Sequence, residues 1–365
     1  MTTIWLAPSA FFPHRGGVEE LTLQLAKELR ARGHRVLVVV NQYPSSLDRQ
    51  ETVEGVDVHR LSFTAPNAKP REAVRFLCSQ PSVQRSLDTL TPRPDIVHVQ
   101  CPSVQTAPLL AYAKRHRLPF VLSSQGEVVM DANQLYERSL YMRLMFRLAS
   151  RSAAALTACS AWTAAQCRLF SPRFATATVI PNGVDPSDWD IGPPTESPVL
   201  CAWGRHVPQK GFDLALRAFA ILRTRVGDAR LLIGGDGPDT PKLREIAGKG
   251  VEFVGPLDRS GVRELLAVSR VAVVPSRIEP FGIVALEALA AGRGLVYAAN
   301  TGLAEAAGDL GRPADVHDPS ALANAMEAEI LLPTVAAAGR ERGRQFSWSR
   351  ICERYLDVYR NAHQQ

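Results

Sequence analysis

The chain has 365 residues, 46 % of them apolar and 21 % charged, a composition typical of a globular protein. This length is too great for one typical domain core and fits two domains. No apolar run reaches the roughly 18–20 residues that a membrane-spanning helix needs, and six cysteines without a CxxC pair indicate a reducing, cytoplasmic setting. Residues 1–184 hold 21 Lys and Arg against 13 Asp and Glu, whereas residues 185–365 hold 21 against 23. The basic first half would attract an anionic lipid surface, a phosphorylated acceptor or nucleic acid, or it is an arginine-rich surface without a specific use.

The first half opens with a strand, a glycine turn and a helix. Ile4–Ala7 is a short apolar run without a preceding cationic region, which is typical of a strand and not of a signal peptide. Gly16 and Gly17 follow, then leucines at helical spacing up to Leu29, and Val36–Val40 is the next strand. This order predicts a doubly wound α/β sheet, in which the glycines would let a phosphate or sugar approach the backbone. Many glycine turns of this kind bind nothing.

A polar turn follows a later strand of the first half. Pro119–Ser123 reads as that strand, and the turn Ser124-Gln125-Gly126-Glu127 comes directly after it. Open α/β sheets bind their ligands at the carboxyl ends of the strands, so this turn is a candidate site.

Two interpretations remain for the helical segment Leu135–Arg151. It carries Arg143, Arg147 and Arg151 at four-residue spacing, beside Leu140, Leu144 and Leu148. Such a helix can lie on an anionic membrane. The alternative, which we favour on the sequence alone, is a helix that packs against the core and leaves a solvated stripe of arginines.

The second half repeats the α/β pattern after a linker. Residues 186–198 are rich in Pro, Ser, Asp and Gly and separate the two halves. Strand Val199–Trp203 leads into a loop that contains Arg205 and Lys210, and a helix starts at Phe212. We therefore expect two similar domains, residues 1–184 and residues 185–347, with a ligand in the cleft between them.

One stretch of the second half combines a strand, a polar turn and a helix N-terminus. Val271–Pro275 reads as a buried strand, Glu279 lies in the turn, and a helix runs from about Phe281 to Gly292. The N–H groups and the dipole of a helix N-terminus favour a phosphate. Glu287 lies six residues further on, roughly 9 Å along the helix at about 1.5 Å per residue. Two carboxylates flanking a phosphate-binding helix end suggest a nucleotide-sugar site, although two solvated glutamates on an ordinary βα unit would look the same.

Several other motifs are missing or misplaced. The sequence has no Walker A motif, no complete GxGxxG, no HExxH and no GxSxG, and it has no aromatic-basic motif for nucleic acid. Asp188-Trp189-Asp190 is a DxD sequence, but it lies in the linker with no strand before it. We therefore expect no metal site.

Taken together, the motifs resemble retaining glycosyltransferase family four, whose members have the GT-B fold. The resemblance covers essentially the whole chain and rests on Glu279-x7-Glu287 with Phe281-Gly282 inside it, on Gly204-Arg205…Lys210-Gly211, on Pro181-Asn182-Gly183-Val184-Asp185, and on Gly16-Gly17…Glu19. It implies two Rossmann-like domains that face each other across a cleft, with a terminal helix of about residues 348–365 returning to the first domain.

The resemblance also implies a role for each matched residue. Arg205 and Lys210 would neutralise the diphosphate of the donor in place of a metal, which suits a leaving group that gains charge in the transition state. Glu287 would bind the ribose and Glu279 the donor sugar. The remaining donor contacts would come from Gly16, Gly17, Phe281, Gly282 and Ile283, and from Gly255 and Leu257 near the base.

The chain departs from the family pattern at Gln125, where many relatives have a histidine near the donor sugar. Glutamine keeps a donor and an acceptor but does not titrate near neutral pH, so we expect it to orient the sugar through hydrogen bonds. Glu127 and Asp131 would suit a cationic acceptor.

The sequence thus predicts a metal-independent, retaining glycosyltransferase that uses a nucleoside-diphosphate sugar, most often a UDP-sugar in this family. The acceptor is a small molecule or a lipid-linked sugar, and the protein is cytoplasmic with a possible peripheral contact to an anionic membrane. No cofactor and no nucleic-acid partner are expected. The alternatives are a non-catalytic protein that binds nucleotide sugars, and a GT-B epimerase or phosphorylase.

Overall fold

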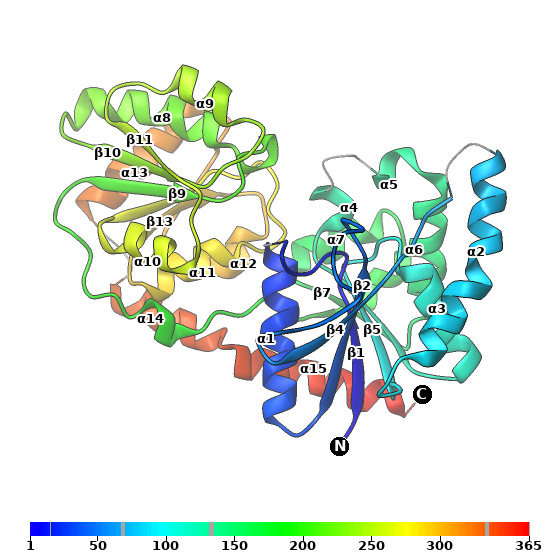
Figure 1. Ribbon diagram of the computed structural model, residues 1–365. Coiled ribbons are helices and arrows are strands. Elements are labelled where there is room, and N and C mark those ends of the chain that lie inside the picture. Colours follow the sequence, from blue (N-terminus) through cyan, green and yellow to red (C-terminus); the bar gives the residue numbers. More distant parts are fainter. Residues whose placement is uncertain (15, 67–69, 131–134, 333–335, 365) are drawn as a thin grey trace. The chain divides into compact units, whose positions relative to one another are not determined.

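The computed structural model describes residues 1–14, 16–66, 70–130, 135–332 and 336–364. The chain divides into two compact units, one made of Met1–Pro181 with Trp348–Gln365 and the other of Asn182–Ser347. The first boundary falls three residues before the expected one, and residues from Trp348 onward belong to the first unit (Figure 1).

The first unit is built on a sheet of eight strands in the order β3-β4-β2-β1-β5-β6-β7-β8. Every strand pair is parallel except β3 and β4, which form an antiparallel hairpin at the edge. The strands are β1 Thr3–Ala7, β2 Arg35–Asn41, β3 Gln50–Val53, β4 Val56–Leu61, β5 Ile96–Gln100, β6 Phe120–Ser124, β7 Ala155–Ala158 and β8 Thr178–Val179.

Helices cover both faces of this sheet, because its central strands are apolar on both sides. The helices of the unit are α1 Gly17–Ala31, α2 Pro70–Thr89, α3 Thr106–His116, α4 Glu127–Met130, α5 Leu135–Arg138, α6 Leu140–Ser152, α7 Ala161–Arg168 and α15 Trp348–His363, with the short 3-10 helix η1 Pro172–Thr176. Along β1, Ile4 and Leu6 join the core formed with α1 and α15. Trp5 and Ala7 point the other way, into the core formed with α3 and α6.

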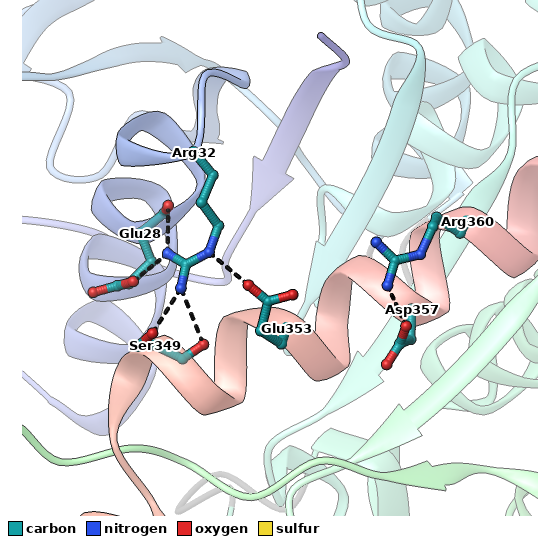
Figure 2. Close-up of polar contacts among 6 residues, drawn as sticks. All are labelled: Glu28, Arg32, Ser349, Glu353, Asp357 and Arg360. Carbon is teal, nitrogen blue, oxygen red and sulfur yellow. Dashed lines mark hydrogen bonds and ion pairs between the residues drawn. The ribbon is translucent and has the colours of Figure 1, made fainter.

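Helix α15 is fixed to the first unit by apolar and polar contacts. Tyr355 and Tyr359 are buried in the same core as α1, and the Tyr359 hydroxyl lies 2.7 Å from Nδ1 of the buried His98 on β5. Arg32, at the end of α1, donates through Nη2 to the Ser349 hydroxyl at 2.7 Å and through Nε to Glu353 at 2.9 Å (Figure 2). A segment distant in sequence is thereby part of the first unit.

The second unit has six parallel strands in the order β11-β10-β9-β12-β13-β14. They are β9 Val199–Trp203, β10 Arg230–Gly234, β11 Val251–Gly255, β12 Val271–Val274, β13 Gly294–Ala298 and β14 Arg312–Ala314. The helices are α8 Phe212–Arg225, α9 Thr240–Ile246, α10 Arg259–Ala267, α11 Ile283–Ala290, α12 Leu303–Ala307, α13 Pro319–Leu331 and α14 Ala336–Gln345, with the short η2 Pro186–Trp189 and η3 Pro208–Lys210. The predicted doubly wound α/β class is therefore present in both units.

The expectation of one long helix over Leu135–Arg151 was wrong. The segment forms two helices, and Ser139 between them caps α6 by accepting a hydrogen bond from the Met142 N–H. Leu140, Leu144 and Leu148 are exposed, and α6 packs inward through Met142, Phe146 and Ala149 instead.

Candidate functional site

The second unit gathers its candidate site where the order of its strands reverses. β9 is the first strand, the chain then proceeds through β10 and β11 on one side, and β12 returns to the other side of β9. The loops that leave two such neighbouring strands diverge and open a ligand site at their carboxyl ends. The loops after β9 and β12 carry most of the predicted donor-binding residues.

These two loops are held against each other by their backbones. The Arg277 N–H donates to the Gln209 carbonyl at 2.8 Å, which joins the loop after β12 to η3. Gly211 has a φ of +66°, and a Cβ there would lie 2.1 Å from the Pro275 carbonyl oxygen. The glycine is needed for this close approach and for the left-handed backbone that precedes α8.

Lys210 and Glu279 meet at this junction. The Lys210 ammonium lies 2.6 Å from Oε2 of Glu279, and the Ser276 hydroxyl donates to the same oxygen at 3.1 Å. The Glu279 side chain is 7 % exposed and that of Lys210 is 22 % exposed. A buried carboxylate is thus paired and hydrogen-bonded, and the ammonium is held in place with part of its surface open.

The N-terminus of α11 lies next to this pair. Gly282 precedes the helix with a φ of +91°, and the first-turn N–H groups from Ile283 onward have no partner within the helix. The Phe281 side chain is buried and packs on the Phe346 ring, so Phe281 offers only its backbone to a ligand. The positive end of the helix dipole therefore points to the end of the unit where Lys210 lies.

Glu287 lies one and a half turns further along α11. Its Oε2 accepts a hydrogen bond of 3.3 Å from Nε1 of Trp203, the last residue of β9. Tryptophan is a hydrogen-bond donor only, so this contact orients the carboxylate. A small hollow at the same end of the unit is lined by Trp203, Lys210, Phe212, Val273, Val274, Pro275, Ser276, Glu279 and Val284.

Arg205 belongs to the same loop as Lys210 but is exposed. Its neighbour His206 is buried, and burial lowers the pKa of its imidazole. The distance between His206 Nδ1 and the Thr240 hydroxyl oxygen is 2.8 Å. A Cβ at Gly235 would lie 1.9 Å from the Gly204 carbonyl oxygen, so the glycines after β10 serve the packing of this loop. That packing explains why the run is glycine-rich without being a dinucleotide motif.

Gly255 and Leu257 lie at the end of β11, two strands from β9 in the sheet. The Gly255 carbonyl accepts the Gly235 N–H at 2.7 Å, and the Leu257 side chain fills the space where Gly234 has no Cβ. These two predicted base contacts are thus joined to the loop after β10 and through it to Arg205.

In the first unit the predicted residues with described positions follow β1 and β6. Gly16 is extended and precedes α1, whose first residue is Gly17. Thr22 of α1 donates to the buried Gln100 at the end of β5 through a bond of 2.8 Å, which places the start of α1 beside that strand. Glu19, in the first turn, has its pKa raised by burial.

Gln125 is buried directly after β6. Both polar atoms of its side-chain amide are inaccessible and make no hydrogen bond of ordinary geometry in the described part of the chain. The amide interacts with the buried Tyr355 hydroxyl of α15, whose pKa is raised by burial and lowered in part by this contact. The Gln125 backbone N–H donates to Oε2 of Glu127 at 2.8 Å. Buried amides rarely lack hydrogen bonds of ordinary geometry, so this one is poised for a ligand.

Glu127 begins the short helix α4. Burial raises the pKa of its carboxyl to about 7, and it is among the groups that, after burial, raise the pKa of the Cys101 thiol. Near neutral pH this carboxyl therefore exists in both protonation states. Asp131, the other predicted acceptor contact, lies outside the described residues.

The DxD sequence does not form a metal site in the described structure. Asp188 lies in η2 and pairs with Arg259, and Trp189 between the two aspartates is buried. Among the residues with described positions, no three His, Cys, Asp or Glu side chains gather in a way that could hold a metal ion. No described helix is long and apolar enough to cross a membrane.

The sequence reasoning missed three residues that shape the second-unit site. Trp203 and Ser276 contact the two predicted glutamates, and Gly302 donates its N–H to the Glu279 carbonyl at 2.8 Å. A Cβ at Gly302 would lie 1.9 Å from the Pro280 carbonyl oxygen. Of the three, Trp203 alone could have been suggested by the sequence, because it ends a predicted strand.

Comparison with known proteins identifies the class to which this fold and site belong. Residues 15–188 match the model described as Glycosyltransferase Family 4, and residues 197–330 match that described as Glycosyl transferases group 1. A glycogen synthase of Mycobacterium tuberculosis is 30 % identical, with 94 % of this chain and 91 % of the relative covered. The chain therefore belongs to glycosyltransferase family 4, which confirms the predicted family.

Other relatives and solved structures agree with this class. A GDP-mannose-dependent alpha-(1-6)-phosphatidylinositol dimannoside mannosyltransferase of Mycobacterium tuberculosis is 29 % identical over 94 % of this chain and 92 % of its own length. A sucrose-phosphate synthase of Thermosynechococcus elongatus superposes with a TM-score of 0.78 at 22 % identity, covering 99 % and 98 % of the two chains. The Anabaena protein HepE, solved with UDP and glucose, superposes with a TM-score of 0.74 at 18 % identity, covering 98 % of this chain and 99 % of that protein. These likenesses confirm the GT-B fold.

Proposed function

We propose that the protein transfers a sugar from a nucleoside-diphosphate sugar, preferentially a UDP-sugar, to a hydroxyl of its acceptor, with retention and without a metal ion. The observation that carries this proposal is the Lys210–Glu279 pair of 2.6 Å beside the N-terminus of α11. A cation, free helix N–H groups and a nearby carboxylate are the groups that a sugar diphosphate requires.

In this proposal the second unit holds the donor. Lys210 and Arg205 neutralise the diphosphate as its bond to the sugar breaks, and the first-turn amides of α11 add hydrogen bonds. Glu287, already oriented by Trp203, accepts the hydrogen bonds of the ribose hydroxyls. Glu279 exchanges part of its contact with Lys210 for hydroxyls of the sugar.

The buried amide of Gln125 supports a polar role in the first unit. It orients the donor sugar through hydrogen bonds, because an amide cannot take the acceptor's proton at neutral pH. The departing phosphate takes that proton on the same face of the sugar, which retains the configuration. Gly16 and Gly17 leave room for the diphosphate at the start of α1.

The acceptor is a small molecule or a lipid-linked sugar. A relative named a phosphatidylinositol dimannoside mannosyltransferase supports a lipid-linked acceptor, whereas another is named a glycogen synthase, so the acceptor varies among the relatives. Glu127, next to Gln125, provides a carboxylate for a cationic group of the acceptor. The six free cysteines support a cytoplasmic setting.

The test begins with thermal shifts against UDP, GDP, dTDP and ADP. The nucleotide that stabilises the protein is then supplied as its sugar conjugates with candidate acceptors, in the presence of EDTA. Mass spectrometry detects the product, and nuclear magnetic resonance gives the configuration of the new bond. We expect UDP to give the largest shift and the product to retain the donor's configuration. Loss of product with EDTA, or an inverted product, would contradict the mechanism, and nucleotide binding without any product would favour a binding protein.

A further inference from the structure

Helix α6 presents an apolar surface to solvent. Eleven large hydrophobic side chains are exposed among the described residues; three of them lie on this helix and a fourth lies in the segment after α7 that contacts it. They are Leu140, Leu144 and Leu148, which are 63 %, 49 % and 43 % exposed, and Leu169, which is 75 % exposed; we call these four the leucine face. A concentration of this kind marks an interaction surface more often than single exposed leucines do.

The leucine face is not a poorly packed core. Phe146, which is buried, lies two residues from both Leu144 and Leu148, about 200° round the helix at roughly 100° per residue. The helix therefore has two apolar sides, one packed on the sheet through Met142, Phe146 and Ala149 and one turned to solvent. No rearrangement of the core is needed to use the outer side.

A second segment contributes to the leucine face. Arg147 of α6 donates through Nε to the Phe170 carbonyl at 2.8 Å, which places the end of α7 beside the helix. Leu169 precedes Phe170 and is the most exposed of the four leucines. The face is thus built by two elements of the first unit and is wider than one helix stripe.

The charges around the leucine face are mostly positive. Helix α6 carries Arg143, Arg147 and Arg151 and no acidic residue, and Arg168 is exposed at the end of α7. Glu137 on α5 is the nearest described acidic residue in sequence before the helix. Arginines beside an apolar face can extend their stems along it and reach anionic groups with their guanidinium heads.

We propose that the leucine face docks the protein on an anionic lipid bilayer, with α6 parallel to the membrane surface. A helix of 13 residues, about 20 Å long, would insert its leucines to the depth of the acyl boundary while its arginines contact lipid phosphates. The shared cationic charge argues against a second copy of the chain as the partner, because two such faces would repel each other.

The position of α6 gives the docking a consequence for catalysis. In chain order, helices α4 and α5 lie between the turn that carries Gln125 and the start of α6. Helix α4 contacts α5, and α5 contacts α6 (Figure 1). Docking would therefore bring the carboxyl edge of the first sheet close to the bilayer. If the proposed transfer reaction holds, the acceptor is then a hydroxyl compound anchored in that bilayer; the docking itself does not depend on this.

Vesicle sedimentation of the whole protein tests the docking. The vesicles are phosphatidylcholine alone or mixed with phosphatidylglycerol, at about 0.1 M and at about 1 M salt, where the Debye lengths are about 10 Å and about 3 Å. The variants are L144S/L148S, whose matched control is Leu331→Ser at an exposed leucine of the second unit, and Arg151→Glu, whose control is Arg350→Glu at an exposed arginine of α15. UDP-dependent thermal shifts are recorded for every variant.

We expect the parent and both controls to bind only the phosphatidylglycerol vesicles and to be released by high salt. L144S/L148S should weaken the partition by about tenfold, and Arg151→Glu by about fivefold. Absence of binding by the parent, or equal binding by L144S/L148S, would overturn the proposal, as would a dimer of the parent that L144S/L148S dissociates. Unchanged UDP shifts in all variants would show that a failed docking leaves the proposed donor site standing.

Discussion

At the scale of single residues, Lys210 and Glu279 hold each other in the geometry that the donor would use. The sequence predicted both as site residues, but gave them separate roles, one for the diphosphate and one for the sugar. Their contact of 2.6 Å means that binding of the proposed donor would exchange one ionic partner for another. Replacing only one of them would leave a buried charge unpaired, so the pair is best changed together.

Gln125 provides a prediction about the chemistry of transfer. Gln125→Ala removes both amide groups without touching the backbone bond to Glu127, so we expect transfer to fall by about tenfold or more and donor affinity to change little. Gln125→His restores a donor and an acceptor and should keep much of the activity. Steady-state kinetics with calorimetric donor titration measures both. Kinetics of the alanine variant equal to those of the parent would remove Gln125 from the mechanism.

The raised pKa of the Glu127 carboxyl predicts that the free energy of unfolding depends on pH. The folded pKa of about 7 is above the ordinary value of 4.5, so the folded protein binds this proton more tightly than the unfolded chain. The carboxyl's contribution to stability is complete below about pH 4.5 and is lost as the pH rises through 7. Glu127→Gln keeps the shape and removes the titration. The free energy of unfolding of the parent, relative to this variant, should fall by about 2–3 kcal/mol between about pH 5 and about pH 8.

Denaturant titrations of the parent and Glu127→Gln at the two pH values give this difference directly. A difference between the two proteins that stays constant with pH would show that the carboxyl titrates normally.

At the scale of elements, α11 depends on the glycine that starts it. Gly282 has a φ of +91°, and a Cβ there would lie 2.3 Å from Cδ2 of Leu303. Gly282→Ala should therefore cost about 1–3 kcal/mol and weaken UDP binding at the helix N-terminus. Gly192→Ala is the matched control, because Gly192 has a φ of +80° in open space. Thermal unfolding and UDP titration check both variants, and equal losses in the two would mean that the contact with Leu303 is unimportant.

The sequence predicted elements well where apolar runs were bounded by turn residues. β9 and the start of α8 fall where expected, because the alternation of apolar runs and glycines marks their ends. α2 and the edge strands β3 and β14 were not predicted, since their sequences are polar or short. The sequence did not decide which side of α6 faces the core, because leucines at helical spacing do not tell a core from an outer apolar face.

At the scale of the whole molecule, two independent sheets each place their candidate residues at strand ends. Gln125 and Glu127 follow β6 of the first sheet, and Lys210 and Glu279 follow β9 and β12 of the second. Their sequence positions predicted this placement, because loops at the carboxyl ends of parallel strands lie at one edge of a sheet. The contacts of Trp203 and Gly302 join segments that are distant in the chain, so the sequence could not show that these residues support the glutamates. Ser276 lies only three residues before Glu279, but its hydrogen bond depends on the conformation of the turn between them.

The most direct test of the proposed donor site is calorimetric titration of UDP into four proteins. They are the parent, K210M/E279Q, which removes the pair without leaving a buried charge, Glu287→Ala, and Lys242→Ala as a control at an exposed lysine of the same unit. We predict that the parent and Lys242→Ala bind UDP equally and that the other two bind at least about tenfold more weakly, with circular dichroism unchanged. Equal UDP affinity in all four proteins would contradict the site.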